Sequence, residues 1–214
     1  MLRFFDIIFS GAALLVLSPI LIFCSLILKF TGEGEVLYRQ ERMGKNLKTF
    51  KLFKFATMVK NSEKLGAGTV TLKNDPRVLP FGKFLRKTKL NELPQLFNVL
   101  FGDMSVIGPR PLAAKQFSFY DDDTKQIIGS VRPGLSGAGS VIFRDEEEIL
   151  SGKDINHDEV YKTKITPLKA KLEIWYVANK SIFLYFKLII LTIMVVLKPN
   201  MDTKKYFKGV NFAE

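Results

Sequence analysis

The sequence predicts a mainly α protein with little β structure (α+β). Three observations lead to this fold class. A long apolar segment opens the chain, a second apolar segment lies near its end, and Pro, Gly and Asn separate short amphipathic stretches between them. At 214 residues, we expect one apolar helix over residues 1–30 and one domain over residues 31–214.

The N-terminal segment has the length and composition of a membrane helix. Residues 7–28 carry no charged side chain, and a helix of about 20 such residues crosses the hydrocarbon of a bilayer. Pro19 removes a backbone donor near the middle, while Ser18 can satisfy a freed carbonyl, so we expect a kink. Cations flank both ends, at Arg3 and Lys29. This near-symmetry leaves a spanning helix and a re-entrant helix both open.

The next elements are short. Residues 36–38 are strand-like and residues 44–46 are typical of a turn, so residues 35–60 are predicted as a strand pair or as a strand and a helix. Proline and glycine residues then precede a helix that contains Phe84 and Leu85.

The stretch from Arg86 to Pro111 is the most informative part of the chain, because it surrounds one apolar helix with cations and carboxylates. Asn91 is expected to be the N-cap of this helix, and Pro94 suits its first turn. Gly102 is placed to end it. A capped core helix with solvated charges is the alternative interpretation.

The start of this helix is expected to bind phosphates. Unpaired backbone N–H groups attract anions there, and Arg86 and Arg110 add positive charge nearby in sequence. Glu92 and Asp103 carry the hard oxygen ligands that Mg²⁺ takes, usually one or two carboxylates together with substrate phosphates. The stretch therefore predicts a site for a diphosphate and Mg²⁺.

The C-terminal part predicts two more helices. Thr166-Pro167 is typical of a helix start. Residues 181–197 are apolar except for Lys187, and they are short for a membrane span. An interfacial amphipathic helix with snorkelling lysines and a core helix both fit this pattern.

Composition narrows the partners. The formal net charge is +11 and the sequence pI is about 9.6, which favours membrane lipid headgroups, phosphorylated substrates or nucleic acid. No nucleic-acid-binding motif is present, so nucleic acid is the weaker choice. The single Cys24 excludes an intramolecular disulfide, and the single His157 excludes a Cys/His zinc site. The sequence leaves an oligomer open. The acidic runs 121–123 and 145–148 could hold a metal ion, but such runs are more often solvated faces.

Several motifs in fixed order resemble the bacterial sugar transferases, the monotopic polyprenol-phosphate phosphoglycosyl transferases. Besides the stretch from Arg86, the matching pieces are Ser18-Pro19, Tyr38-Arg-Gln-Glu-Arg-Met-Gly44, Phe53-Lys-Phe-Ala-Thr-Met58, Asn74-Asp-Pro-Arg77 and Val131-Arg-Pro-Gly-Leu-Ser-Gly137. The resemblance is nearly full-length. It implies that a phosphosugar passes from a UDP-sugar to polyprenol (undecaprenyl) phosphate with Mg²⁺ present, releasing UMP. This would be the first membrane step of polysaccharide or glycoconjugate synthesis.

The resemblance also implies a location and a topology. The expected location is the bacterial inner (cytoplasmic) membrane, with a re-entrant N-terminal helix and the catalytic domain on the cytoplasmic face. Five cations are predicted to bind the substrate: Lys54, Arg86, Arg110, Arg132 and Arg144. The Pro/Gly-rich turns at Arg110 and Arg132 would hold planar guanidinium groups for bidentate contact with phosphate.

Position 91 departs from the family pattern. The family has Leu-Asp-Glu-Leu-Pro with the Asp as nucleophile, whereas this chain has Leu-Asn91-Glu92-Leu-Pro. A carboxamide has no anionic oxygen to attack phosphorus. Three explanations fit: Glu92 attacks, another carboxylate such as Asp145 takes over or the transfer is direct, or the chain is an inactive or substituted form. Asn91 and Glu92 are thus the catalytic candidates. Of the possible roles of Glu92, binding the metal ion is the preferred one. A catalytically silent nucleotide-sugar or membrane-binding homologue is the alternative function.

Overall fold

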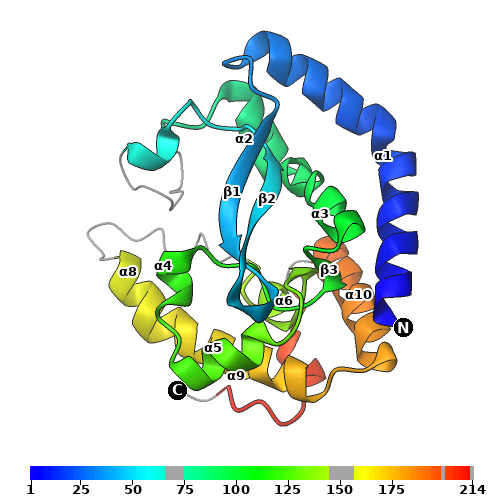
Figure 1. The fold of residues 1–214 in the computed structure, drawn as a ribbon, viewed down its shortest axis with the longest axis vertical. Helices are drawn as coiled ribbons and strands as arrows, with labels where there is room; N and C mark the ends of the chain where they lie inside the picture. Colours follow the sequence, from blue (N-terminus) through cyan, green and yellow to red (C-terminus); the bar gives the residue numbers. More distant parts are fainter. Residues whose placement is uncertain (66–74, 145–156, 199–200, 213–214) are drawn as a thin grey trace.

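The computed structural model describes residues 1–65, 75–144, 157–198 and 201–212. Short helices surround two small two-stranded sheets, which confirms a mainly helical α+β fold (Figure 1). The described helices are α1 Leu2–Thr31, α2 Pro80–Lys87, α3 Gln95–Phe101, α4 Ala114–Phe117, α5 Asp122–Gly129, α6 Ala138–Ile142, α8 His157–Val160, α9 Thr166–Ala178 and α10 Ile182–Leu197. The strands are β1 Leu37–Met43, β2 Thr49–Phe55, β3 Ser105–Ile107 and β4 Gly134–Ser136. Short turns of other helix types are η1 Lys45–Leu47, η2 Ser62–Lys64, η3 Leu90–Glu92, η4 Tyr161–Ile165 and η5 Lys204–Tyr206.

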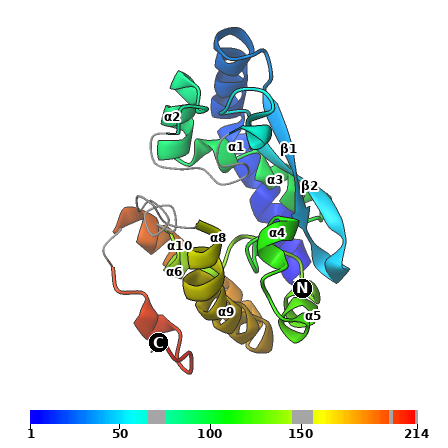
Figure 2. The same cartoon turned by 90° about the vertical axis from the view of Figure 1, so that its left-hand side faces the viewer.

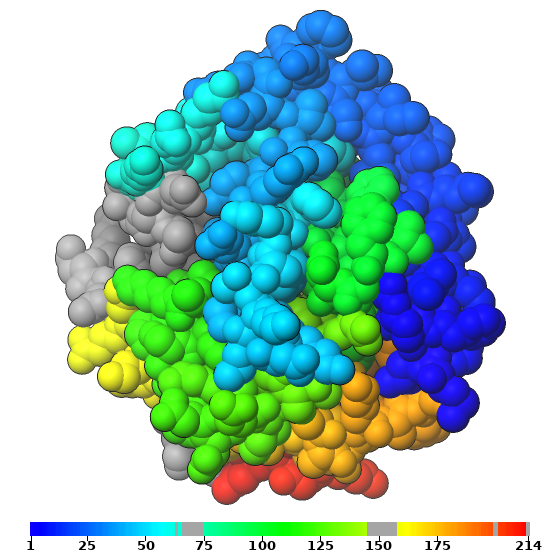
Figure 3. All heavy atoms as spheres, in the orientation of Figure 1, coloured from blue at the N-terminus to red at the C-terminus, as the bar shows by residue number. Residues whose placement is uncertain are grey.

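Helix α1 is continuous over 30 residues and contains Pro19. Figure 1 shows it along one edge of the molecule, with its two halves running in different directions, and Figure 3 shows it on the surface. Of the helices that the structure describes, α1 is the one long and apolar enough to cross a membrane. Large apolar side chains such as Leu15 and Phe23 are exposed along it.

The first turns of α1 are fixed to the body of the protein by polar contacts. The Arg3 guanidinium donates to the backbone carbonyls of Val99 and Leu100, the latter at 2.7 Å. These carbonyls lie in the last turn of α3, where backbone acceptors lack helical partners. The charge of Arg3 also suits the negative end of that helix.

Asp6, one turn further on, is buried between α1, β3 and α10. Its Oδ1 atom accepts hydrogen bonds from the Ser105 hydroxyl, the Val106 backbone N–H and the Tyr185 hydroxyl, each at 2.9 Å. Burial together with the Asp6 carboxylate raises the pKa of the Tyr185 hydroxyl, so Tyr185 remains a donor. A buried carboxylate with three donors is well satisfied.

The last turns of α1 contact a different part of the same body. Cys24 and Leu28 are buried in an apolar cluster with Phe55 of β2 and Leu85 of α2. Both ends of α1 therefore pack against the domain formed by the rest of the chain.

Strands β1 and β2 form an antiparallel hairpin, which confirms the strand-pair interpretation of residues 35–60. Tyr38 pairs with Lys54, and the turn between the strands holds Asn46 at φ 56°. Asparagine tolerates this left-handed conformation better than most residues do. Figure 2 shows the hairpin beside α3. The predicted helix around Phe84 and Leu85 is confirmed as α2.

The predicted helix start at Asn91 is wrong. Asn91 lies inside the 3-10 turn η3, makes no capping hydrogen bond there, and α3 begins only at Gln95. The backbone hydrogen bonds here run from residue i to residue i−3, from Glu92 to Lys89 and from Leu93 to Leu90, each at 3.1 Å, which is the 3-10 pattern. The predicted end is confirmed, since Gly102 follows α3 with φ 100°, a conformation that favours glycine.

Strands β3 and β4 are parallel and bring two turns together. A Cβ added to Gly134 would lie 2.1 Å from the backbone nitrogen of Gly108, so this crossing requires glycine. The Gly134 N–H donates to the Pro109 carbonyl at 2.8 Å. The turn that carries Arg110 is therefore held against the loop that carries Arg132.

Helices α9 and α10 build the largest apolar core. Helix α9 begins at Thr166, as predicted, but it directly continues α8 and the π-helical turn η4, so Thr166-Pro167 does not begin the helical run. The inner face of α10 is core, as the core-helix interpretation predicted, with Tyr185 and Leu188 both 1% exposed. Its outer face leaves Phe183 exposed and is apolar, which keeps the interfacial interpretation open as well.

Candidate active site

A carboxylate and two cations from three separate elements meet beside the β1–β2 hairpin. Glu92 comes from η3, Lys54 from β2 and Arg110 from the turn after β3. The Glu92 Oε1 atom lies 3.3 Å from a guanidinium nitrogen of Arg110 and 3.7 Å from the Lys54 ammonium. The side chains of Glu92 and Lys54 are 21% and 20% exposed. A ligand from solvent can therefore reach a cluster whose charges are only partly screened.

The surroundings keep Glu92 ionised. Burial by itself raises the pKa of this carboxyl, but the charges of Arg110, Lys54 and Lys89 outweigh that effect and bring it down to about 2. Burial lowers the pKa of the Lys54 ammonium to about 8, with Glu92 opposing the change. At neutral pH the cluster thus contains a carboxylate and cations, all charged.

Arg42 joins this cluster, although the sequence did not single it out. Burial and the charge of Arg110 lower its pKa to about 10, and Glu92 opposes this. The hairpin register explains its place: Tyr38 pairs with Lys54, and Arg42, four residues along the same strand, faces the same side. The alternation of side chains along the strand could have pointed to Arg42, but only if the pairing register of β1 and β2 had been known.

Asn91 lies next to Glu92 in the 3-10 turn η3. It is 8% exposed, and its side-chain oxygen Oδ1 has no hydrogen-bond partner among the described residues. Buried polar atoms usually have a partner. An unpaired oxygen beside the charged cluster therefore marks position 91 as a place where a ligand, water or another side chain would be expected.

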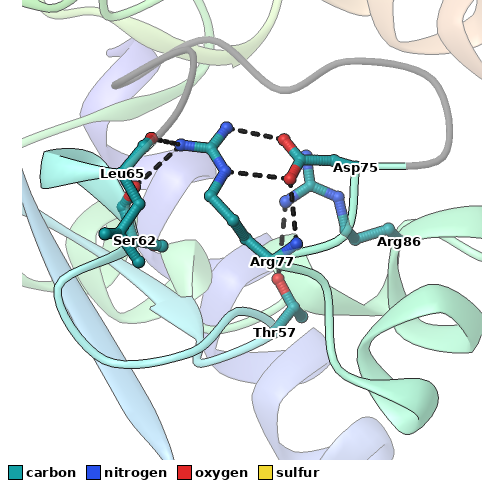
Figure 4. A network of polar contacts seen from close by, with 6 residues as sticks. All are labelled: Thr57, Ser62, Leu65, Asp75, Arg77 and Arg86. Atoms are coloured by element: carbon teal, nitrogen blue, oxygen red, sulfur yellow. Dashed lines mark hydrogen bonds and ion pairs between the residues drawn. The ribbon is translucent and has the colours of Figure 1, made fainter.

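Arg86 lies close enough to Lys54 for its charge to lower the pKa of that ammonium. Its guanidinium is 3.5 Å from the Thr57 hydroxyl, next to a buried polar network (Figure 4). In this network Arg77 donates to both carboxylate oxygens of Asp75, at 2.9 and 2.6 Å. Arg77 also donates to the backbone carbonyls of Ser62 and Leu65, at 2.7 Å each. Asp75 and Arg77 of the Asn-Asp-Pro-Arg motif thus support the chain beside Arg86, whereas Asn74 lies outside the described residues.

Three other predicted site residues contact different partners. Arg132 donates through Nε to the Gly102 carbonyl at 2.8 Å, and Arg144 donates to the Val195 carbonyl of α10. Asp103 accepts from the Asn98 side chain at 3.2 Å. In the part of the chain that the structure describes, none of these three side chains forms a hydrogen bond or an ion pair with Glu92. Asp145 and the acidic run 145–148 lie outside the described residues.

The structure does not bring Glu92 and Asp103 together around one metal ion, as the sequence had predicted. The two residues flank opposite ends of α3, a helix about 10 Å long. Among the residues that the structure describes, no three His, Cys, Asp or Glu side chains converge as a metal site. Glu92 alone fits Mg²⁺ in the manner of sites that take one carboxylate and complete their coordination with substrate phosphates and water.

Glu173 was also missed by the sequence analysis. This buried carboxylate of α9 lies behind the turn that carries Arg110. An acidic residue within a helix is ordinarily read as solvated, so no local signal marked it.

Comparison with known proteins adds the following similarities. The family model described as bacterial sugar transferase matches residues 1–199. The undecaprenyl-phosphate galactose phosphotransferase of Salmonella typhimurium is 34% identical over 213 residues, which cover 92% of this chain and 40% of that protein. The UDP-glucose:undecaprenyl-phosphate glucose-1-phosphate transferase of Klebsiella pneumoniae is 37% identical over 196 residues, covering 89% and 39%. The exopolysaccharide production protein ExoY of Rhizobium meliloti is 33% identical over 208 residues, covering 91% and 84%. This chain spans about two fifths of the length of the first two relatives and most of the third.

Proposed function

Because this chain belongs to the bacterial sugar transferase family, we propose that it transfers a sugar phosphate from a UDP-sugar to undecaprenyl phosphate and releases UMP. Two relatives are named for transfer of a sugar phosphate to undecaprenyl phosphate, and one name includes the UDP-sugar donor. The product would be a polyprenol-diphosphate sugar, the first membrane-bound intermediate of a polysaccharide or glycoconjugate.

The observation that carries this proposal is the cluster of Arg42, Lys54 and Arg110 around Glu92. Its cations exceed its single described carboxylate, and a partly enclosed excess of positive charge suits the diphosphate of a nucleotide sugar. Arg110 can contact two phosphate oxygens at once because its guanidinium is planar. Lys54 supplies a more compact charge.

In the proposed reaction the β-phosphorus of the UDP-sugar gains a bond to an attacking oxygen, and its bond to the bridging oxygen of UMP breaks. The attacking oxygen belongs to an enzyme carboxylate or to the acceptor phosphate. Arg110 and Lys54 would stabilise the negative charge on the transferring phosphate and the leaving UMP. Glu92 would hold Mg²⁺, which when bound neutralises further phosphate charge.

The test of this proposal is release of UMP. Purified protein is incubated with a panel of UDP-sugars, Mg²⁺ and undecaprenyl phosphate, and UMP is quantified together with the lipid product. We expect UMP only when both substrates are supplied, or in a substoichiometric burst without acceptor if an enzyme intermediate forms. UDP-sugar binding without UMP from any donor would support the silent homologue instead.

We further propose that α1 is a re-entrant membrane helix bent at Pro19, with the domain on the cytoplasmic face of the inner membrane. The support is that both ends of α1 contact one domain, at Arg3 and Asp6 on one side and at Leu28 on the other. A domain on one side of a bilayer about 30 Å thick cannot hold both ends of a straight spanning helix. The exposed apolar faces of α1 and α10 would contact lipid.

This topology predicts that both ends of α1 are accessible from the same side. One cysteine is inserted after Met1, or introduced as Thr31→Cys, in a Cys24→Ala background, and sealed membrane vesicles of known orientation are treated with an impermeant maleimide. We expect both positions to react from the cytoplasmic side only. Reaction of the N-terminal cysteine from the periplasmic side, with Thr31→Cys protected there, would show a spanning helix.

A further inference from the structure

Glu173 is a buried carboxylate next to the candidate active site. It is 2% exposed, and its Oε1 atom accepts a long hydrogen bond of 3.5 Å from the backbone N–H of Arg110. Its second oxygen, Oε2, has no hydrogen-bond partner among the described residues. Burying an acid in this way destabilises the ionised form, so the position calls for a reason other than stability.

The backbone of the Arg110 turn supplies one reason. Pro109 and Pro111 have no backbone N–H, so the Arg110 amide is the single backbone donor of this three-residue stretch, and it points to Glu173. On the other side, the Pro109 carbonyl accepts from the N–H of Gly134. The turn is therefore held from two sides, by α9 and by β4.

Helix α6 approaches the same carboxylate. The backbone of Gly139 lies close enough to Glu173 to lower the pKa of its carboxyl, and a Cβ at this position would lie 2.4 Å from Oε1. A side chain at position 139 would therefore displace the Glu173 carboxylate. Lys169, one turn earlier on α9 and 2% exposed, adds a positive charge nearby, and its ammonium lies 3.1 Å from the Tyr161 hydroxyl. These contacts make a built polar site inside the fold.

We propose that Glu173 is a positioning residue for the transfer reaction: it fixes the backbone at Arg110, so that the guanidinium stays against Glu92 where a nucleotide diphosphate binds. The guanidinium lies 3.3 Å from Glu92, and Glu173 reaches the bound diphosphate only through Arg110. This inference rests on the proposed function, because it assigns to Arg110 the phosphates of that reaction.

The ionisation of Glu173 agrees with this role. Burial raises the pKa of its carboxyl to about 7, although the N–H groups of Arg110 and Gly139 and the charge of Lys169 act in the opposite direction. Tyr176, also on α9, stays neutral because burial and Glu173 raise its pKa. Because the folded protein holds the proton on Glu173 more tightly than the unfolded chain does, protonated Glu173 favours the folded state. This contribution to the free energy of unfolding is complete below about pH 4.5 and is lost as pH rises through about 7.

The test measures UDP binding and unfolding together, because neither requires turnover. The full chain, in detergent or nanodiscs, is titrated with UDP and Mg²⁺ at pH 5.5 and pH 8, unmodified and as Glu173→Gln. We expect Glu173→Gln to bind UDP about tenfold more weakly at pH 8 and equally at pH 5.5, where the native carboxyl is itself protonated. Its unfolding temperature at pH 8 should be equal or higher, since a costly buried charge is gone. Lys171→Gln, on the exposed face of the same helix, is the matched control.

A double-mutant cycle with Arg110→Lys tests whether Glu173 acts through Arg110. We expect the double variant to bind UDP about as weakly as Arg110→Lys alone, because the two changes remove one arrangement. Additive losses, unchanged UDP binding by Glu173→Gln at pH 8, or no UDP binding by the unmodified chain would each overturn the inference. Failure of the proposed function is separate: UMP would not be released, while the UDP-binding differences would persist.

Discussion

Replacing Asn91 by aspartate is expected to create or strongly raise UMP release, on the order of 10²-fold or more over the present chain. The physical reason is that a carboxylate supplies the anionic oxygen that an amide lacks. Aspartate has nearly the same shape as asparagine, and the buried Oδ1 of Asn91 has no partner among the described residues, so the exchange needs no repacking. In contrast, Glu92→Gln is expected to abolish activity, because Arg110 and Lys54 lose the carboxylate that they pair with.

The intact mass of the protein after mixing with UDP-sugar provides the control for this pair of variants. A phosphosugar adduct on Asn91→Asp, mapped to position 91, would identify the attacking carboxylate. An adduct on the present chain that maps to Glu92 would contradict the assignment of Glu92 as the metal ligand and make it the nucleophile. Asn61→Asp, which changes an exposed asparagine in the same way, should leave UMP release unaltered.

Asp6→Ala is expected to lower the free energy of unfolding by about 3 kcal/mol or more. The change leaves three donors without their acceptor, Ser105, Val106 and Tyr185, and each buried donor without a partner costs about 1 to 3 kcal/mol. Unfolding by denaturant in a fixed detergent measures the effect. The free energy of unfolding of Asp6→Asn should fall between those of the unmodified protein and Asp6→Ala, because the amide oxygen still accepts while its NH₂ group faces other donors.

Asp123→Ala is the control for loss of a carboxylate, since Asp123 is exposed on α5 and such surface changes usually alter stability by less than about 0.5 kcal/mol. Equal unfolding of the Asp6→Ala and Asp123→Ala proteins would mean that α1 is not fixed to the domain by Asp6. A loss confined to Asp6→Ala would show that this carboxylate joins α1, β3 and α10 in solution.

The centre of the candidate site could be predicted from the sequence because its members occur in short, distinctive stretches. Glu92 and Arg110 share one stretch, and Lys54 lies in a motif of its own. The contacts of Arg132 and Arg144 could not be predicted. Both donate to backbone carbonyls at helix ends, Gly102 after α3 and Val195 in the last turn of α10, where acceptors lack helical partners and the helix dipole is negative. A sequence shows a cation, but it does not show whether that cation meets a phosphate or a backbone carbonyl.

Two further differences between the sequence prediction and the structure have different causes, one in contacts between distant residues and one in local structure. Glu173 is buried because Gly139 and the Arg110 turn close over it, and neither neighbour is visible from the pattern of α9. The start of α3 was misplaced for a local reason, since the N–H groups of Glu92 and Leu93 donate to residues three positions earlier and the α-helix begins only at Gln95. Periodicity located the helix and its end at Gly102, but it did not reveal the 3-10 turn that carries Asn91 and Glu92.

The attachment of α1 at both ends limits how this chain can be rearranged. A membrane anchor that merely tethers a domain can be exchanged for any apolar helix of similar length. Here α1 supplies Arg3 to cap α3 and Asp6 to join β3 to α10, so a grafted helix would remove part of the folded domain. An exchange of N-terminal segments with a relative should therefore succeed only where the incoming helix brings equivalent partners for α3, β3 and α10.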